Sequence, residues 1–123
     1  IDVARPLEIA GKRIVPVSGH HSERFEVTGY RIGRMAYLTD FKTIADAEVG
    51  KLIGVELLVV NALRFRPHPS HFNVEEALAL IARVAPRRAL ITHVSHEIGR
   101  HAATTALLPR GVELAYDGLE III

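Results

Sequence analysis

Residues 57–77 read LLVVNALRFRPHPSHFNVEEA, and they are the most informative part of the sequence for predicting the fold. It opens with a continuously apolar run over residues 57–60, which is typical of a strand buried on both faces of a parallel sheet. It closes with Asn73 and Glu76, spaced as a capping box, after which apolar residues recur at helical spacing until Pro86. The stretch therefore predicts a strand, a polar loop and an amphipathic helix, the repeating unit of an α/β protein.

Upstream of this unit, the pattern changes from strands alone to strands alternating with helices. Short apolar runs over residues 7–32 indicate a β-meander, and a strand follows over residues 35–39. A helix is predicted over about residues 44–53, with Thr43 as its cap and Gly54 at its end.

Downstream, the alternation continues to the end of the chain. A strand is predicted over residues 88–92 and a weaker helix over about 98–108. Residues 112–123 carry a strong turn signal at Asp117 and Gly118, which predicts a terminal β-hairpin. We therefore expect one α/β domain in which a meander feeds alternating strands and helices.

The composition excludes several classes of protein. The chain has 123 residues, 49% of them hydrophobic, and 15 Lys and Arg against 14 Asp and Glu, which suits one domain without a polybasic surface. No apolar run approaches the length of a bilayer crossing, so we expect a cytoplasmic protein with no membrane partner. Without cysteine, imidazole and carboxylate groups remain as metal ligands. The first residue is Ile1 rather than Met, so we expect a truncated chain.

Polar residues stand at the carboxyl ends of three successive predicted strands. Asp40 follows residues 35–39, Asn61 and Arg64 follow residues 56–60, and His93 follows residues 88–92. Parallel strands end at one edge of a sheet, so these residues would converge there. A carboxylate and an imidazole suit a divalent metal such as zinc or manganese. The alternative interpretation is that Asp40 caps the following helix and His93 is a hydrogen-bonded buried histidine.

Basic side chains gather in the loop between residues 61 and 73. Arg64, Arg66, His68 and His71 lie in a proline-stiffened stretch that opens onto a helix N-terminus, which favours binding of a phosphate-like anion. His71, close to the helix start, is placed to donate a proton to a leaving group. The alternative is a solvated loop with basic side chains.

In their order and spacing, these motifs resemble the C-terminal half of the metallo-β-lactamase-fold hydrolases. The segments that carry the resemblance are residues 29–32, 37–40, 61–77, 90–93 and 115–118. The branch is that of the cyclic-phosphate phosphodiesterase of phosphonate breakdown and of ribonuclease Z, and the resemblance covers the chain from about Val15 onward. It implies that residues 1–123 form half of an αββα sandwich, without the N-terminal half that carries the His-x-His-x-Asp-His motif.

The resemblance also implies a set of metal ligands. Asp40 matches the aspartate that bridges two divalent ions, and His93 matches the last metal histidine. The middle histidine is His20 or His21, and we prefer His21 because Ser22 follows it as in the related phosphodiesterases. Two metal ions, zinc or manganese, are thus expected in the full-length protein. The ligands in this chain amount to about two per ion, so the chain alone is expected to bind metal weakly or not at all.

The remaining roles concern the substrate. His71 matches the histidine that binds or protonates the scissile phosphate, and Arg64 and His68 are expected near the substrate. Weaker claims attach to His96 and His101, for which a place at the surface is the more common outcome.

We therefore expect the full-length protein to be a dinuclear metal-dependent hydrolase of a small phosphodiester or cyclic phosphate, and this chain to be inactive alone. One alternative is a ribonuclease of the transfer-RNA-processing type, with nucleic acid as substrate. The other is a non-catalytic interaction module that retains the fold. Half of a sandwich would expose the apolar face of its sheet, so we also expect a dimer or another homo-oligomer, or pairing with the N-terminal half.

Overall fold

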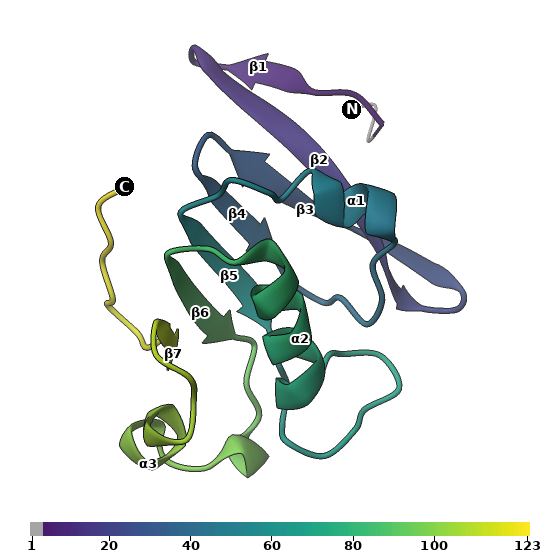
Figure 1. The fold of residues 1–123 in the computed structure, drawn as a ribbon. Helices are drawn as coiled ribbons and strands as arrows, with labels where there is room; N and C mark the ends of the chain where they lie inside the picture. Colours follow the sequence, from purple (N-terminus) through teal and green to yellow (C-terminus); the bar gives the residue numbers. More distant parts are fainter. Residues whose placement is uncertain (1–3) are drawn as a thin grey trace.

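The computed structural model describes residues 4–123, which form one mixed sheet with helices packed against it (Figure 1). Its seven strands lie in sequence order, and they are β1 (Leu7–Ile9), β2 (Lys12–Ser22), β3 (Phe25–Ile32), β4 (Met35–Leu38), β5 (Leu57–Asn61), β6 (Arg88–Thr92) and β7 (Val112–Leu114). The helices are α1 (Asp46–Gly50), α2 (Val74–Val84) and α3 (His101–Ala106), with a 3-10 turn, η1 (His96–Ile98). Strands β1 to β4 pair antiparallel and β4 to β7 pair parallel, which confirms the predicted α/β order.

Helices α1 and α2 cover one face of the sheet (Figure 1). The capping box of α2 forms as predicted, because Asn73 Oδ1 accepts from the Glu76 N–H and Glu76 accepts from the Asn73 N–H. The apolar side of α2 then packs on the inward side chains of β4 to β7 in one buried core. None of the helices within residues 4–123 has the length and apolar character needed to cross a bilayer.

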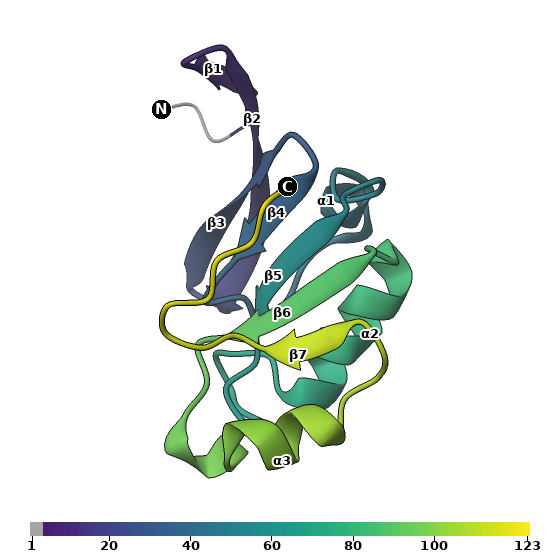
Figure 2. The ribbon, with the colours of Figure 1, turned by 90° about the vertical axis from the view of Figure 1, so that its left-hand side faces the viewer.

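The opposite face of the sheet is covered in part by the end of the chain, which crosses it in Figure 2. Leu119 and Ile121 pack against a smaller cluster of Leu57, Val59 and Leu90. Further along this face, apolar side chains line an open hollow of about 490 Å³, and they are Leu7, Ile9, Ile14, Tyr30, Ile32, Met35 and Tyr37. This part of the face is thus apolar and open to solvent.

The predicted terminal hairpin is wrong. Of residues 112–123, the segment Val112–Leu114 forms a strand, and it pairs parallel with β6 rather than with residues 119–123. The predicted turn does form, since Gly118 has a φ of 86° and the Leu119 N–H donates to the Tyr116 carbonyl at 3.1 Å. The chain then crosses the sheet face because burial of Leu119 and Ile121 there replaces edge pairing.

Two predicted helices are shorter than expected. The first begins at Asp46 without a side-chain cap, because the Thr43 backbone is engaged in a β-bridge with His20. Gly54 has the predicted left-handed conformation, with a φ of 88°. In the second, Gly99 adopts a φ of 98° and separates η1 from α3.

The backbone of Phe41 joins three segments behind the carboxyl edge of the sheet. Its N–H donates to the side-chain oxygen of the fully buried Asn61 at 2.9 Å, and its carbonyl accepts from the Asn61 amide at 2.9 Å. The same carbonyl accepts from the Phe72 N–H at 2.8 Å. The Phe41 ring lies against Gly19 and Gly29, where an added Cβ would be in steric contact with Phe41 or its neighbours. Phe41 is therefore fixed through both its backbone and its ring.

We predict that Asn61→Asp lowers the free energy of unfolding by about 2 kcal/mol at neutral pH, because the introduced carboxylate faces the Phe41 carbonyl and cannot donate to it. Burial beside an acceptor raises the folded-state pKa of that carboxyl, so the destabilisation is complete above the folded pKa. It disappears as the pH falls below the unfolded value of about 3.9, where the protonated group can donate. Urea unfolding at several pH values, each compared with the unsubstituted chain, measures the difference.

Asn73→Asp is the matched control, because the Asn73 side chain acts there as a cap that accepts from the Glu76 N–H. Aspartate serves equally well at this position, so little change in stability is expected. Equal losses for the two substitutions would contradict the role given to the Asn61 amide.

Candidate metal centre

Asp40 and His93 both stand at strongly bent positions of the backbone at the carboxyl edge of the parallel strands. Asp40 follows β4 with a φ of 64°, and His93 follows β6 with a φ of 58°. Left-handed conformations in residues other than glycine cost about 1–2 kcal/mol and persist where the surroundings impose them, often at functional sites. The two turns bring His93 Nε2 to 3.3 Å from Asp40 Oδ1. The predicted convergence of these two residues is therefore present in the structure.

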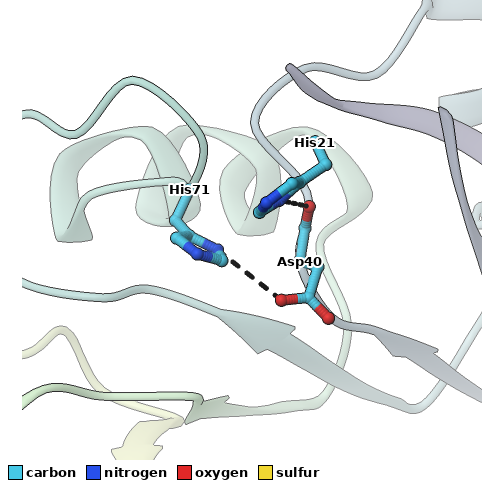
Figure 3. A group of neighbouring side chains, drawn as sticks. All are labelled: His21, Asp40 and His71. Carbon is cyan, nitrogen blue, oxygen red and sulfur yellow. Dashed lines mark hydrogen bonds and ion pairs between the residues drawn. The ribbon is translucent and has the colours of Figure 1, made fainter. Parts of the chain in front are cut away.

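A β-bulge places His21 beside Asp40. His20 pairs with Glu26 and Ser22 pairs with Phe25, so His21 is the extra residue that bends the β2–β3 hairpin. Its Nδ1 lies 3.0 Å from the Asp40 backbone carbonyl (Figure 3). A carbonyl can only accept, so Nδ1 carries the hydrogen and Nε2 keeps its lone pair available to a metal.

His71 lies at the centre of this group of side chains. Its ring centroid is 4.7 Å from that of His21, 4.8 Å from that of His93 and 5.1 Å from that of His68. The side chain is 13% exposed, and its Nδ1 is buried, 3.8 Å from Asp40 Oδ1, with no hydrogen-bond partner within residues 4–123. Burial and the neighbouring imidazoles lower the pKa of His71, and the Asp40 carboxylate opposes them in part. The neutral form, which can bind a cation, is thereby favoured.

These residues fit a divalent metal ion. Ligand atoms of His21, Asp40 and His71 all lie within 4.8 Å of one another, and His93 contacts the same carboxylate. The His71 Nδ1, which has no partner among the described residues, lies beside a carboxylate and further imidazoles. Imidazole and carboxylate groups are the ligands that zinc and similar metals prefer. Asp40 does not act as a helix cap, because α1 has no side-chain cap. His93 is not a buried histidine, because it is exposed beside Asp40.

Of the other predicted histidines, one lies within this group and three lie outside it. His68 lies within it, and its Nδ1 accepts from the Ser70 N–H at 3.1 Å. Burial lowers the pKa of His68, and the charges of Arg64 and Lys42 lower it further. His20 is exposed on the regular part of β2, and His96 is exposed on η1. His101 is engaged elsewhere, with its Nε2 2.9 Å from the Leu114 carbonyl.

The basic loop contains an interaction that sequence reasoning missed. Glu97 Oε2 accepts from Arg66 at 2.9 Å and from Arg64 at 3.4 Å. The hydrogen bond from Arg66 lowers the pKa of Glu97, which holds it ionised. The guanidinium of Arg64 also donates to the Arg66 carbonyl at 3.3 Å and the Pro67 carbonyl at 2.9 Å. The sequence contains one indication of this contact, because Glu97 lies only four residues after His93 and so on the same side of the site.

Comparison with known proteins agrees with this fold. The family model of the beta-lactamase superfamily domain matches residues 1–94. A curated relative, an octanoyltransferase of Porphyromonas gingivalis (strain ATCC BAA-308 / W83), is 38% identical over 119 residues, which cover 96% of this chain and 24% of that protein. The chain therefore spans about a quarter of that relative.

Solved structures extend the comparison. A diphosphatase from the PhnP family is 37% identical with a TM-score of 0.92, over 97% of this chain and 46% of that one. The metallo-β-lactamase fold protein YhfI from Bacillus subtilis is 18% identical with a TM-score of 0.77, over 97% and 53% of the two chains. Human tRNase Z, short form, is 17% identical with a TM-score of 0.69, over 92% and 44%.

The chain spans about half the length of these solved relatives. The two at lower identity show the fold alone, which is the α/β fold that the resemblance implied. With residues 1–94 of its 123 matched by the family model, the chain belongs to the beta-lactamase superfamily and has the metallo-β-lactamase fold.

Proposed function

We propose that the polypeptide carrying this chain is a metal-dependent hydrolase that cleaves a phosphodiester or a cyclic phosphate. The observation that carries this proposal is the convergence of His21 and His71 on Asp40 (Figure 3), with His93 Nε2 3.3 Å from the same carboxylate. The 37% identity to a diphosphatase supports a phosphate-containing substrate. Because the chain covers 46% of that structure, the activity is proposed for the whole polypeptide.

His21, Asp40 and His93 are the proposed metal ligands, with Asp40 shared between two divalent ions, zinc or manganese. The bulge at His21 and the left-handed turns at Asp40 and His93 orient these ligands before any ion arrives. When bound, the ions supply Lewis-acid polarisation of a phosphoryl oxygen. Two complete sites need more than three protein ligands, so residues outside this chain are proposed to complete them.

His71 and His68 are the proposed phosphate-binding residues. Both lie on one loop, and Arg64 adds positive charge close to His68. These basic side chains favour binding of an anionic group between them and the proposed metal site. His71 is proposed as the group that donates a proton to the leaving oxygen, in the protonated form that the Asp40 carboxylate and an anionic substrate favour. Asp40 would hold the imidazole in place by its charge, at 3.8 Å.

We predict that loss of one ligand lowers metal affinity at least about tenfold in the polypeptide that carries this chain. His21→Ala and His93→Ala should lose zinc or manganese on dialysis, as measured by mass spectrometry of the bound metal. His20→Ala is the matched control, since His20 is the neighbouring exposed residue of the same strand. A loss in His20→Ala equal to that in His21→Ala would refute the ligand assignment.

In the same preparations, His71→Ala should retain metal and lower kcat by about 10²-fold or more, the usual effect of removing a general acid. Turnover of bis(p-nitrophenyl) phosphate and of a 2′,3′-cyclic nucleotide reports the activity. Loss of metal in His71→Ala would make His71 a ligand instead. If the unsubstituted polypeptide shows no metal-dependent turnover of any phosphodiester, the proposed function is wrong.

The open apolar face is proposed as the surface that another part of the protein covers. Tyr30, Ile32 and Tyr37 are 37%, 40% and 42% exposed there. Exposed apolar surface of this extent marks an interaction site. The occupant we propose is the remaining part of the polypeptide, because the solved diphosphatase has about as much chain again outside the matched region.

We predict that the 123-residue chain alone self-associates through this face, with a sedimentation coefficient that rises with concentration. Replacing Tyr30 and Tyr37 together by Ser should weaken the association, since both lie on the open face. Replacing Leu107, an exposed apolar residue at the end of α3, by Ser is the control. A compact monomer at high concentration would count against an interaction at this face.

A further inference from the structure

The loops that carry His71 and His93 are joined by side chains outside the group around Asp40. We propose that Arg64 and Glu97 form a clamp that fixes the separation of these two loops, which makes both of them positioning residues. The inference rests on the proposed function, because it assigns the clamp to the same site. It gives Arg64 a role distinct from direct contact with substrate.

The first half of the clamp is the loop over residues 64–73, which is closed at its base. The Leu63 N–H donates to the Phe72 carbonyl at 2.9 Å, and the Val74 N–H donates to the Arg64 carbonyl at 3.0 Å. Within the loop, the Arg64 side chain donates to the carbonyls of residues 66 and 67. Its planar fork of donors is thus engaged with its own loop, a geometry that lysine cannot reproduce.

The second half is the segment that continues from His93. Its Ser95 N–H donates to the Leu63 carbonyl at 2.8 Å, which places η1 against the base of the first loop. The Ser95 side chain caps η1, and Glu97 in that turn reaches Arg64 and Arg66. One carboxylate therefore connects the loop of His71 to the loop of His93.

The position of the clamp indicates a geometric role rather than a role in overall stability. The Arg64–Glu97 pair is 3.4 Å long between side chains that are 24% and 33% exposed, and Arg66, the second partner of Glu97, is 75% exposed. Ion pairs as long or as exposed as these contribute little to the free energy of unfolding. The His71 and His93 rings, in contrast, lie 4.8 Å apart on the two joined loops. A shift of either loop by about 1 Å would move its imidazole relative to Asp40, and misplacement on that scale costs on the order of 10²-fold in rate.

The test compares Arg64→Lys and Glu97→Gln in the polypeptide that carries this chain. Both substitutions preserve size, and Arg64→Lys also preserves the charge near His68. The matched control is Arg34→Lys with Glu56→Gln, because this exposed ion pair, at 3.2 Å, precedes β4 and β5 at the opposite edge of the sheet. The readouts are amide hydrogen exchange over residues 64–73, bound metal, melting temperature, and kcat and KM on bis(p-nitrophenyl) phosphate.

In both clamp variants we expect exchange over residues 64–73 to quicken by about tenfold, as local opening becomes easier, with an unchanged melting temperature. The kcat should fall at least about tenfold with bound metal unchanged, since the loop of His71 shifts while the hydrogen bond from the Ser95 N–H to the Leu63 carbonyl still holds the segment of His93. Exchange should quicken most in Glu97→Gln, which weakens the contacts of the carboxylate with both Arg64 and Arg66. The double variant should add little to Glu97→Gln, because Arg64 reaches the second loop through Glu97. The control substitutions should change none of these quantities.

Unchanged exchange over residues 64–73 in both variants would overturn the clamp, as would an equal effect of the control substitutions. Faster exchange with unaltered kcat would overturn the positioning role. If the unsubstituted polypeptide turns over no phosphodiester, the proposed function fails, and the exchange comparison alone still decides whether the clamp exists.

Discussion

The candidate metal centre depends on the hydrogen bonds that hold the backbone of Phe41. Asn61, at the end of β5, binds both the N–H and the carbonyl of Phe41, and that carbonyl also accepts from Phe72. Phe41 directly follows Asp40, and Phe72 directly follows His71. One buried amide therefore sets the positions of the carboxylate and of the central imidazole. A buried side chain with both partners satisfied holds such a geometry firmly, because each unmade bond carries a desolvation penalty.

Around this connection, local backbone features orient the ligand side chains. Asp40 and His93 take left-handed conformations that residues other than glycine seldom adopt, and His21 is the extra residue of a bulge. These features cost free energy, and the surrounding sheet imposes them. In the cluster of imidazoles around His71, a buried nitrogen has no partner in the described part of the chain. These features fit the proposed binding of a cation beside Asp40.

Much of this arrangement follows from the sequence. The apolar run at the start of residues 57–77 and the capping box at Asn73 predict a strand and a helix, and parallel pairing then brings Asp40 and His93 to one edge. Alternation cannot distinguish His20 from His21, because the bulge shifts the register by one residue. Glu97 was missed because it pairs with Arg64 across 33 positions. The last strand was predicted wrongly because residues 119–123 have strand propensity, but burial against Leu57 and Leu90 decides their path.

We propose that the carboxyl edge of β4 to β6 binds divalent metal through residues of this chain. Anomalous diffraction from crystals of the full polypeptide grown with zinc is the decisive measurement. We expect a peak within about 2.0–2.2 Å of the Asp40 carboxylate and of a ring nitrogen of His21 or His93. A zinc ion at full occupancy that is bound elsewhere, with Asp40, His21 and His93 free of metal, would contradict this proposal.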